Sequence, residues 1–254
     1  MTVGREQVRV ARGQLWRLVK VVKMTVRPYV ILSCAMSLDG CIDDVSDERL
    51  LLSNEADFDR VDELRASCDA ILVGANTIRR DNPRLLVKSD ARRQAREARG
   101  VPPYPVKVTI TSTIFDPDLK FFTSGGEKLV YSPGSAVGRV QARLGDRATV
   151  VGAGEEAVDF TAMLHDLAGR GIQRLMVEGG STIHTQFLTQ GLVDELQLAI
   201  APFFVGQPGA PRFVNSGAFP HDAQHRMILH ETRQIGDIVF LRYLAPLPLE
   251  GMTC

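Results

Sequence analysis

The feature that most constrains the fold of this chain is an alternation, from Tyr29 onward, of short apolar runs with segments of helical periodicity. The first run, residues 29–36, has the length of a buried strand and is followed by an Asp-Gly turn. Asn54 then precedes apolar residues spaced three and four apart, which predicts a capped helix, and residues 69–74 follow as a second buried strand. This order predicts an α/β domain.

The same pattern continues along the rest of the domain. Further strands are expected at residues 106–111, 128–131, 148–151, 174–178, 195–200, 226–232 and 238–244. Helical periodicity recurs at residues 158–169 and 182–190, each followed by glycine near its end. Strands that alternate with helices up to residue 200 predict a three-layer architecture with a mostly parallel central sheet. Gly236-Asp237 is expected to join the last two strands as an antiparallel hairpin.

The ends of the chain differ from this domain in composition. Residues 1–24 carry six cationic side chains against one glutamate. We expect a basic, poorly ordered N-terminal extension over residues 1–24, one domain over residues 25–246 and a C-terminal tail over residues 247–254. A surface-binding helix or an organelle address is the alternative for the extension. Residues 89–100 are rich in arginine without an apolar face and are interpreted as a solvated excursion.

Composition limits the class of ligand. The 30 basic and 30 acidic residues cancel, which argues against a surface built to bind nucleic acid or a membrane over its whole extent. The four cysteines form no Cys-x-x-Cys pair and the five histidines show no metal-binding spacing, so no metal site is expected. Reduced packing thiols fit the cytoplasm. No apolar stretch reaches the roughly 18 residues of a membrane-spanning helix, and a small-molecule ligand is therefore expected.

Two strand-to-helix turns, residues 72–77 and 176–182, are candidates for phosphate binding. In each, a buried strand runs into glycine and then into a hydroxyl residue, Thr77 or Ser181, which can cap the next helix while donating to a phosphate oxygen. Either turn alone also suits an ordinary tight turn, but together they predict a ligand site. A third glycine-rich segment, residues 152–157, is interpreted as structural, because its two glutamates would repel a pyrophosphate.

Charged residues adjoin these turns. Glu178 stands where a strand leaves the sheet, so its carboxylate must be hydrated, paired with a cation or bound to ligand donors. Residues 81–88 place an acid, an amide and two cations in one loop, which suits either a phosphorylated polyol or a solvated turn stiffened by proline. Arg65 taken alone reads as a surface charge, and His184 is expected on a helix surface.

Several segments together resemble the reductase of riboflavin biosynthesis, either free-standing or as the C-terminal half of the bifunctional deaminase-reductase. They are residues 29–40, 51–65, 71–87, 174–188 and 192–206, and the likeness spans about residues 27–244. It implies a dihydrofolate-reductase-like fold, a homodimer, and NADPH-dependent reduction of the ribosyl chain of a phosphorylated ribosylaminopyrimidine to the ribityl form. The substrate implied is 5-amino-6-(5-phosphoribosylamino)uracil or its 2,5-diamino precursor.

The resemblance also assigns residues to roles, with Glu178 and Asp81 as the catalytic pair. It places at the cofactor Ala35, Leu51, Thr77, Asp81, Ser112, Gly179, Gly180, Ser181 and Thr182. It places at the substrate Arg65, Leu85, Lys88 and Glu178. In this assignment Arg65 and Lys88 supply positive charge for the 5′-phosphate, and the two carboxylates orient sugar hydroxyls or the opened aldehyde.

Three positions depart from the family pattern. Ser33 stands where many members have lysine, Lys88 where arginine is frequent, and Phe115 where an arginine helps to hold the 2′-phosphate of NADPH. NADH is therefore the alternative cofactor. A reductase of the same fold acting on a related pyrimidine or pteridine is the alternative enzyme, and a ligand-binding module without catalysis is the alternative from another class.

Overall fold

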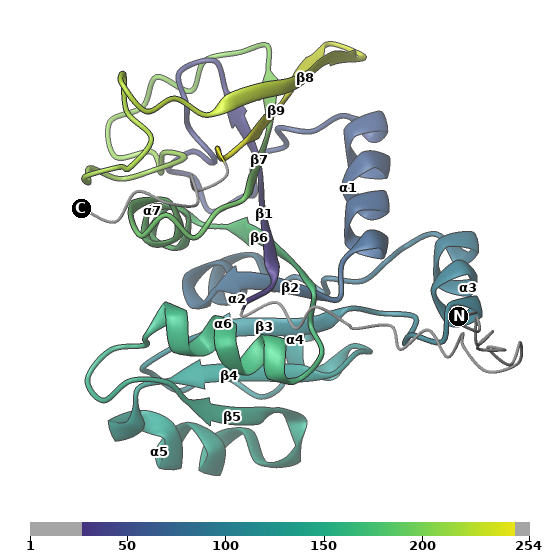
Figure 1. The fold of residues 1–254 in the computed structure, drawn as a ribbon, viewed down its shortest axis with the longest axis vertical. Coiled ribbons are helices and arrows are strands. Elements are labelled where there is room, and N and C mark those ends of the chain that lie inside the picture. The colour runs from purple at the N-terminus through teal and green to yellow at the C-terminus, as the bar shows by residue number, and fades with distance from the viewer. Residues whose placement is uncertain (1–26, 247–254) are drawn as a thin grey trace, which may run out of the picture.

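The computed structural model describes residues 27–246, so the expectations for residues 1–24 and 247–254 fall outside the described residues. The strands are β1 (Tyr29–Ser37), β2 (Ala70–Gly74), β3 (Val106–Ile110), β4 (Lys128–Ser132), β5 (Thr149–Gly152), β6 (Arg174–Gly179), β7 (Glu195–Ala201), β8 (Ile228–Ile235) and β9 (Ile238–Leu244). They form one sheet in the order β5-β4-β3-β2-β6-β1-β7-β9-β8 (Figure 1). The pairs from β5 across to β7 are parallel, which confirms the mostly parallel sheet.

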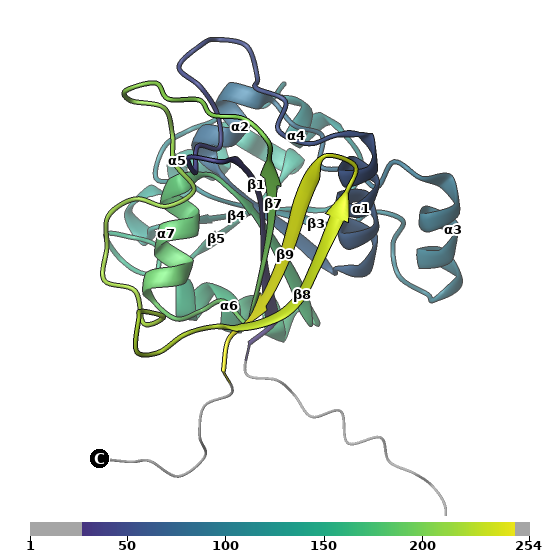
Figure 2. The ribbon, with the colours of Figure 1, turned by 90° about the horizontal axis from the view of Figure 1, so that it is seen from above.

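Helices cover both faces of this sheet, as the three-layer prediction requires (Figures 1 and 2). The helices are α1 (Glu55–Ser67), α2 (Ala75–Asp81), α3 (Asp90–Ala98), α4 (Lys120–Thr123), α5 (Gly134–Leu144), α6 (Phe160–Gly169) and α7 (Ser181–Thr189), with a 3₁₀ turn η1 (Gly145–Arg147). Helices α6 and α7 pack on one face, and α1, α2 and α5 pack on the other. At the carboxyl ends of the parallel strands lie the loops that lead from the strands into the helices.

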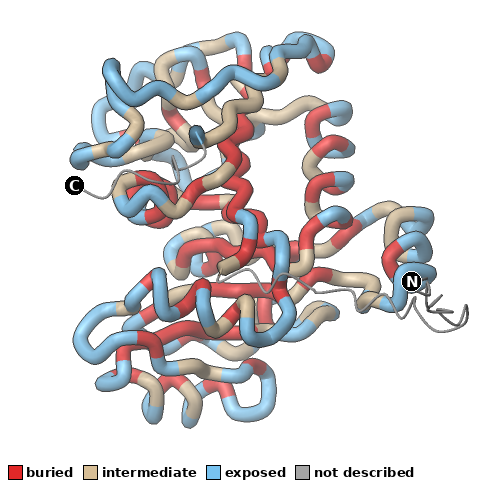
Figure 3. The backbone as a smooth tube through the Cα atoms, in the orientation of Figure 1, coloured by how far each residue is buried: buried red, intermediate tan, exposed pale blue. Residues whose placement is uncertain are grey.

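The core follows from the apolar runs in the central strands. Leu32 and Ile31 are neighbours in β1, and because successive side chains point to opposite faces, Leu32 joins the cluster under α6 and α7 while Ile31 joins the cluster under α1 and α2. Both are fully buried, and buried backbone follows β1 and β6 through the middle of the molecule (Figure 3). A strand covered on both faces reads as a continuous apolar run, which is why β1 could be predicted.

The C-terminal hairpin also matches its prediction. β9 pairs with β7 and β8 pairs with β9, both antiparallel. Ile235 pairs with Ile238 across the two-residue turn, where Gly236 has a φ of +64°, a left-handed value that glycine adopts without strain. β8 forms one edge of the sheet.

Residues 89–100 are more ordered than the predicted solvated excursion. Ser89 caps α3 by accepting a hydrogen bond from the backbone N–H of Arg92. Arg96 is buried and donates to the backbone oxygens of Ala66 at 2.8 Å and Cys68 at 2.7 Å, at the end of α1. A guanidinium that satisfies helix carbonyls thus holds α3 to the domain, and a search for apolar periodicity does not detect such an anchor.

In residues 152–157, Gly154 has a φ of +83° and a Cβ there would lie 2.2 Å from the oxygen of Ala157, which is a structural need for glycine, but Glu156 and Ala157 also line the cleft of the candidate active site. Helices α4 and α5 had no counterpart in the sequence pattern. Cys34, Cys41 and Cys68 are buried free thiols, whereas Cys254 lies outside the described residues. Among residues 27–246, no helix has both the length and the apolar character needed to cross a membrane.

Candidate active site

A large cleft lies at the carboxyl ends of the parallel strands, lined by the loops after β1, β2, β3 and β6. Its volume is about 1400 Å³, whereas pockets for one small ligand usually span about 300–1,000 Å³. The cleft therefore has room for a nucleotide and a second ligand together. All the predicted site residues except Gly179 line it: Ala35, Leu51, Arg65, Thr77, Asp81, Leu85, Lys88, Ser112, Glu178, Gly180, Ser181 and Thr182.

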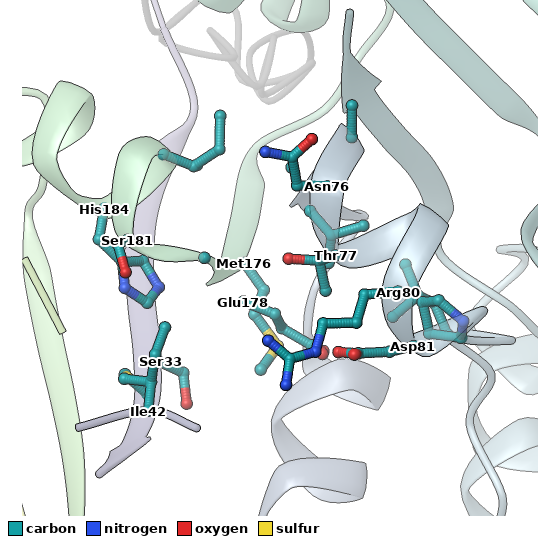
Figure 4. A pocket seen from close by; sticks show the side chains of 18 of the residues that line it. Ser33, Ile42, Asn76, Thr77, Arg80, Asp81, Met176, Glu178, Ser181 and His184 are labelled. Carbon is teal, nitrogen blue, oxygen red and sulfur yellow. The ribbon is translucent and has the colours of Figure 1, made fainter. Parts of the chain in front are cut away.

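The two glycine turns meet at the centre of this cleft. A Cβ on Gly74 would lie 2.9 Å from Cγ1 of Ile183 and 3.4 Å from the oxygen of Gly179. A Cβ on Gly180 would lie 3.4 Å from Oγ1 of Thr77. In Figure 4, Thr77 and Ser181 stand on opposite sides of the same cavity. The two turns therefore converge, and close approach explains the glycine at position 74, whereas a Cβ at position 180 would make an ordinary contact.

The predicted hydroxyl caps are wrong. Gly74 and Gly180 are themselves the N-cap residues of α2 and α7, and neither helix has a side-chain cap. Ser181 lies one position inside α7, and its hydroxyl donates to the backbone oxygen of Arg212. The first N–H groups of α7 are therefore left without a side-chain acceptor, and such groups together with the helix dipole attract an anion.

Glu178 and Arg65 form a bidentate ion pair across the floor of the cleft. Nε of Arg65 lies 2.6 Å from Oε1 of Glu178, and Nη2 lies 2.6 Å from Oε2. The two side chains are 17% and 14% exposed. Burial alone would lower the pKa of Arg65, but the carboxylate of Glu178 outweighs it and raises that pKa. Of the alternatives for Glu178, pairing with a cation is the one observed, and this pairing offsets the charge that Arg65 was expected to offer a phosphate.

Asp81, the last residue of α2, faces the same space as Glu178 (Figure 4). Burial raises the pKa of Asp81, and the Asp43 carboxylate adds to this increase, while Arg49 and Arg80 oppose it. Asp81 consequently keeps its proton to a higher pH than an exposed aspartate does. A carboxyl group with this property can donate a proton to a reacting oxygen or nitrogen.

The loop after α2 is fixed in an unusual backbone conformation. Asn82 and Leu85 have φ values of +44° and +48°, in the left-handed region. The side-chain oxygen of Asn82 accepts the backbone N–H of Lys120 at 2.6 Å, and the buried carboxylate of Asp62 accepts the backbone N–H of Lys88. The backbone of the loop is therefore held in place while the ammonium group of Lys88 remains exposed at the cleft.

The prediction that His184 lies on a helix surface is wrong. His184 is 1% exposed, and its Nδ1 lies 3.1 Å from the oxygen of Phe213. Burial lowers its pKa to about 4, although the Phe213 carbonyl raises it slightly. The ring is neutral at neutral pH and packs on Gly179, where a Cβ would lie 3.0 Å from Nε2. A side chain at position 179 would therefore clash with the His184 ring, so glycine is needed there. Gly179 shapes the cleft, although it does not line it.

Lys120 is a cation at the cleft that sequence reasoning missed. It lies on α4 and lines the same end of the cleft as Arg84 and Lys88. Among residues 27–246, none of these three cations forms an ion pair with a carboxylate. Since α4 is a single helical turn more than thirty residues after the loop, no local pattern could have placed Lys120 here.

These features agree with the comparison to known families. A model of the RibD C-terminal domain matches residues 28–241. The chain belongs to the RibD C-terminal domain family.

Two relatives with named activities are similar over most of the chain. The 2,5-diamino-6-ribosylamino-4(3H)-pyrimidinone 5′-phosphate reductase of Methanothermobacter thermautotrophicus is 39% identical over 221 residues, which cover 86% of this chain and 98% of that protein. The protein of the same name from Archaeoglobus fulgidus is 37% identical over 195 residues, 76% of this chain and 89% of that protein.

Solved structures in the RibD group share the fold. RibD of Acinetobacter baumannii superimposes with a TM-score of 0.68 at 23% identity, covering 88% of this chain and 59% of the longer RibD chain. A pyrimidine reductase-like protein of Corynebacterium diphtheriae gives 0.69 at 22% identity, covering 87% of this chain and 92% of that one.

Proposed function

We propose that this protein is the reductase that converts the ribosyl chain of 2,5-diamino-6-ribosylamino-4(3H)-pyrimidinone 5′-phosphate to the ribityl form with NADPH, in riboflavin biosynthesis. The observation that carries the proposal is one cleft that combines a glycine-lined cradle with a carboxylate pair and unpaired cations. The names of the two relatives above support this substrate. The deaminated compound, 5-amino-6-(5-phosphoribosylamino)uracil, is the alternative substrate of the same chemical class.

The cradle fits a nicotinamide dinucleotide. Its backbone can approach a diphosphate closely, because a Cβ on Gly180 would occupy the space beside Thr77. Ser181 and Thr182 present the first backbone N–H groups of α7 to the same space. The residues proposed to hold the cofactor are Ala35, Leu51, Thr77, Asp81, Ser112, Gly180, Ser181 and Thr182, whereas Gly179, which does not line the cleft, is proposed only to shape the turn. When bound, the nicotinamide supplies a hydride to C1′ of the ring-opened sugar.

The other end of the cleft suits the phosphorylated sugar. Because Glu178 offsets the charge of Arg65, we assign the 5′-phosphate to the unpaired ammonium of Lys88, with Arg84 and Lys120 beside it. Leu85, in the loop after α2, is buried in the apolar cluster that also contains Ile78 and anchors this loop. Arg65 and Glu178 act as one unit, in which the guanidinium orients the carboxylate toward sugar hydroxyls.

The chain contributes positioning and a proton. Asp81, whose pKa is raised, donates the proton that the reduced centre needs, and Glu178 accepts hydrogen bonds from the open-chain sugar. Two ligands bound side by side react as an effectively unimolecular pair, which is the main source of acceleration available to such a site.

We further propose a homodimer in the cytoplasm. Ile228, Leu229 and Val239 on the edge hairpin are 56%, 53% and 45% exposed, and an unpaired edge strand with apolar side chains favours association. Sedimentation velocity of the purified chain tests this: a dimer mass is expected, and a monomer at micromolar concentration contradicts it.

A related pyrimidine or pteridine is the second candidate substrate. Ser33 favours it, because this buried residue lines the cleft where the family resemblance led us to expect a lysine. Faster turnover of such a compound than of the ribosylaminopyrimidine would select this candidate.

The test of the main proposal is a direct assay. Purified protein, the diamino substrate and NADPH should together lose the near-ultraviolet absorbance of the reduced nicotinamide, and mass spectrometry should identify the ribityl product. Glu178→Gln, prepared identically, is the control for contaminating reductases. Absence of product with both NADPH and NADH would contradict the proposal.

A further inference from the structure

Two arginines, one lining the cleft and one bonded to a residue that lines it, have no role in the proposed chemistry. Arg79 lines the cleft from α2, and Arg139 lies on α5. Their hydrogen-bond acceptors within residues 27–246 are hydroxyl, amide and carbonyl oxygens, and include no carboxylate. Neither guanidinium group therefore forms an ion pair with a carboxylate within the described part of the chain.

Arg79 is held in one orientation. Its Cζ lies 4.7 Å from the centroid of the Phe115 ring, which is 2% exposed and therefore a fixed platform. Its Nη2 donates to Oγ1 of Thr113 at 2.5 Å, and its Nη1 lies 3.3 Å from Oδ1 of Asn76. A guanidinium stacked and tethered in this way loses little side-chain entropy when it binds an anion.

Arg139, on α5, contacts the same loop. Its Nη2 donates to the backbone oxygen of Ser112 at 3.2 Å, directly after β3. Ser112 and Thr113 line the cleft and are exposed, so their hydroxyl groups are accessible to a ligand. Two guanidinium groups and adjacent hydroxyls form a setting suited to a phosphate dianion.

The direction of the cofactor, which rests on the proposed function, identifies that phosphate. The nicotinamide must lie at Asp81 and Glu178, where the sugar reacts, and the diphosphate fits the start of α7 beside Gly180. The adenosine then extends toward the ends of β3 and β4. We propose that Arg79 and Arg139 bind the 2′-phosphate of NADPH and thereby set the preference for NADPH over NADH.

Glu156 is the opposing group. Glu156 also lines the cleft, and a carboxylate can accept a hydrogen bond from the free 2′-hydroxyl of NADH. Two guanidinium groups against one carboxylate favour the phosphorylated nucleotide. If the Glu156 carboxylate instead cancelled the effect of the two guanidinium groups, the protein would bind nucleotides with and without a 2′-phosphate equally well.

The test measures binding without turnover. Calorimetry with adenosine 2′,5′-bisphosphate and with 5′-AMP reports the contribution of the 2′-phosphate to wild type, Arg79→Gln and Arg139→Gln. Arg143→Gln is the matched control, because Arg143 lies one turn further along α5 and is exposed without any contact to the cleft. Losing one charge-assisted contact should weaken bisphosphate binding by about tenfold or more in each of the first two variants. Binding of 5′-AMP and the Arg143→Gln variant should be unchanged.

The outcomes separate this inference from the proposed function. If wild type reduces the substrate with NADPH but Arg79→Gln and Arg139→Gln bind the bisphosphate as wild type does, the assignment of these arginines is wrong and the reductase remains. Equal wild-type affinity for the two nucleotides, or faster turnover with NADH, also overturns the assignment. Failure of the proposed function would instead appear as no turnover with either cofactor.

Discussion

Replacing Glu178 with glutamine tests whether the ion pair with Arg65 serves both stability and chemistry. The substitution keeps the shape of the side chain but leaves the guanidinium without its counter-charge. Two unit charges about 4 Å apart attract by about 4 kcal/mol at an effective dielectric constant of about 20. The side chains are 17% and 14% exposed in an open cleft, so water can rehydrate part of Arg65. We therefore expect a loss of about 2 kcal/mol, below the roughly 3–5 kcal/mol seen when fully buried pairs are broken.

For a domain of this size, that loss corresponds to a fall in melting temperature of about 4–8 °C. Thermal and urea unfolding of Glu178→Gln measure it. Asp59→Asn is the matched control, because Asp59 pairs with Arg92 through two bonds of 2.6 and 2.8 Å but is 69% exposed. This control should change stability little, since exposed ion pairs contribute little.

Activity distinguishes the chemical role from the structural one. Glu178→Gln combined with Arg65→Met removes both charges and should recover much of the lost stability, because no unpaired guanidinium is left. Turnover should stay at least about 100-fold below wild type in both variants if Glu178 contacts the substrate. Unchanged stability in Glu178→Gln would refute the energetic reasoning, and substantial activity in the double variant would refute the substrate contact.

Three further substitutions probe other parts of the account. Asp81→Asn should lower kcat by about 100-fold or more and abolish the decline of wild-type activity as pH rises through the raised pKa of Asp81, whereas an unchanged pH–rate profile excludes Asp81 as proton donor. Burial lowers the pKa of Lys107 to about 7 from 10.5, so between these values the unfolded chain holds a proton that the folded chain has lost. Stability should therefore increase with pH over this range by up to about 1.4 kcal/mol per pH unit, and denaturant titrations of Lys107→Met should lack that slope. Gly180→Ala places a Cβ 3.4 Å from Oγ1 of Thr77 and should weaken NADPH binding about tenfold or more. Gly138→Ala, which meets nothing within 4 Å, should leave binding intact, and equal affinities in the two variants contradict the cradle.

The part of the site that could be predicted from the sequence depends on strand order. The runs that became β2 and β6 were long and apolar enough to be recognised as buried strands, and parallel strands bring their carboxyl ends to one edge. Their turns therefore had to meet, and Gly74 and Gly180 do lie against the opposite segment. The carboxylate at Glu178 was recognised as needing a partner for the same reason, because it follows a buried strand.

The partner itself could not be read from the sequence. Arg65 lies on α1, and its approach to Glu178 depends on how α1 packs over the sheet. His184 was misjudged because its polar ring suggested exposure, whereas the structure buries it against Gly179. Lys120 depends on the path of a long connection. Long-range packing decides all three, and local periodicity carries no information about it.

Isotope transfer tests the central claim most directly, because it follows the reacting atom itself. NADPH deuterated at the transferred position of the nicotinamide is incubated with the protein and 2,5-diamino-6-ribosylamino-4(3H)-pyrimidinone 5′-phosphate, and the product is analysed by mass spectrometry and NMR. The account predicts a ribityl product carrying a single deuterium at C1′. A product without deuterium, or with deuterium on the pyrimidine ring, would contradict it.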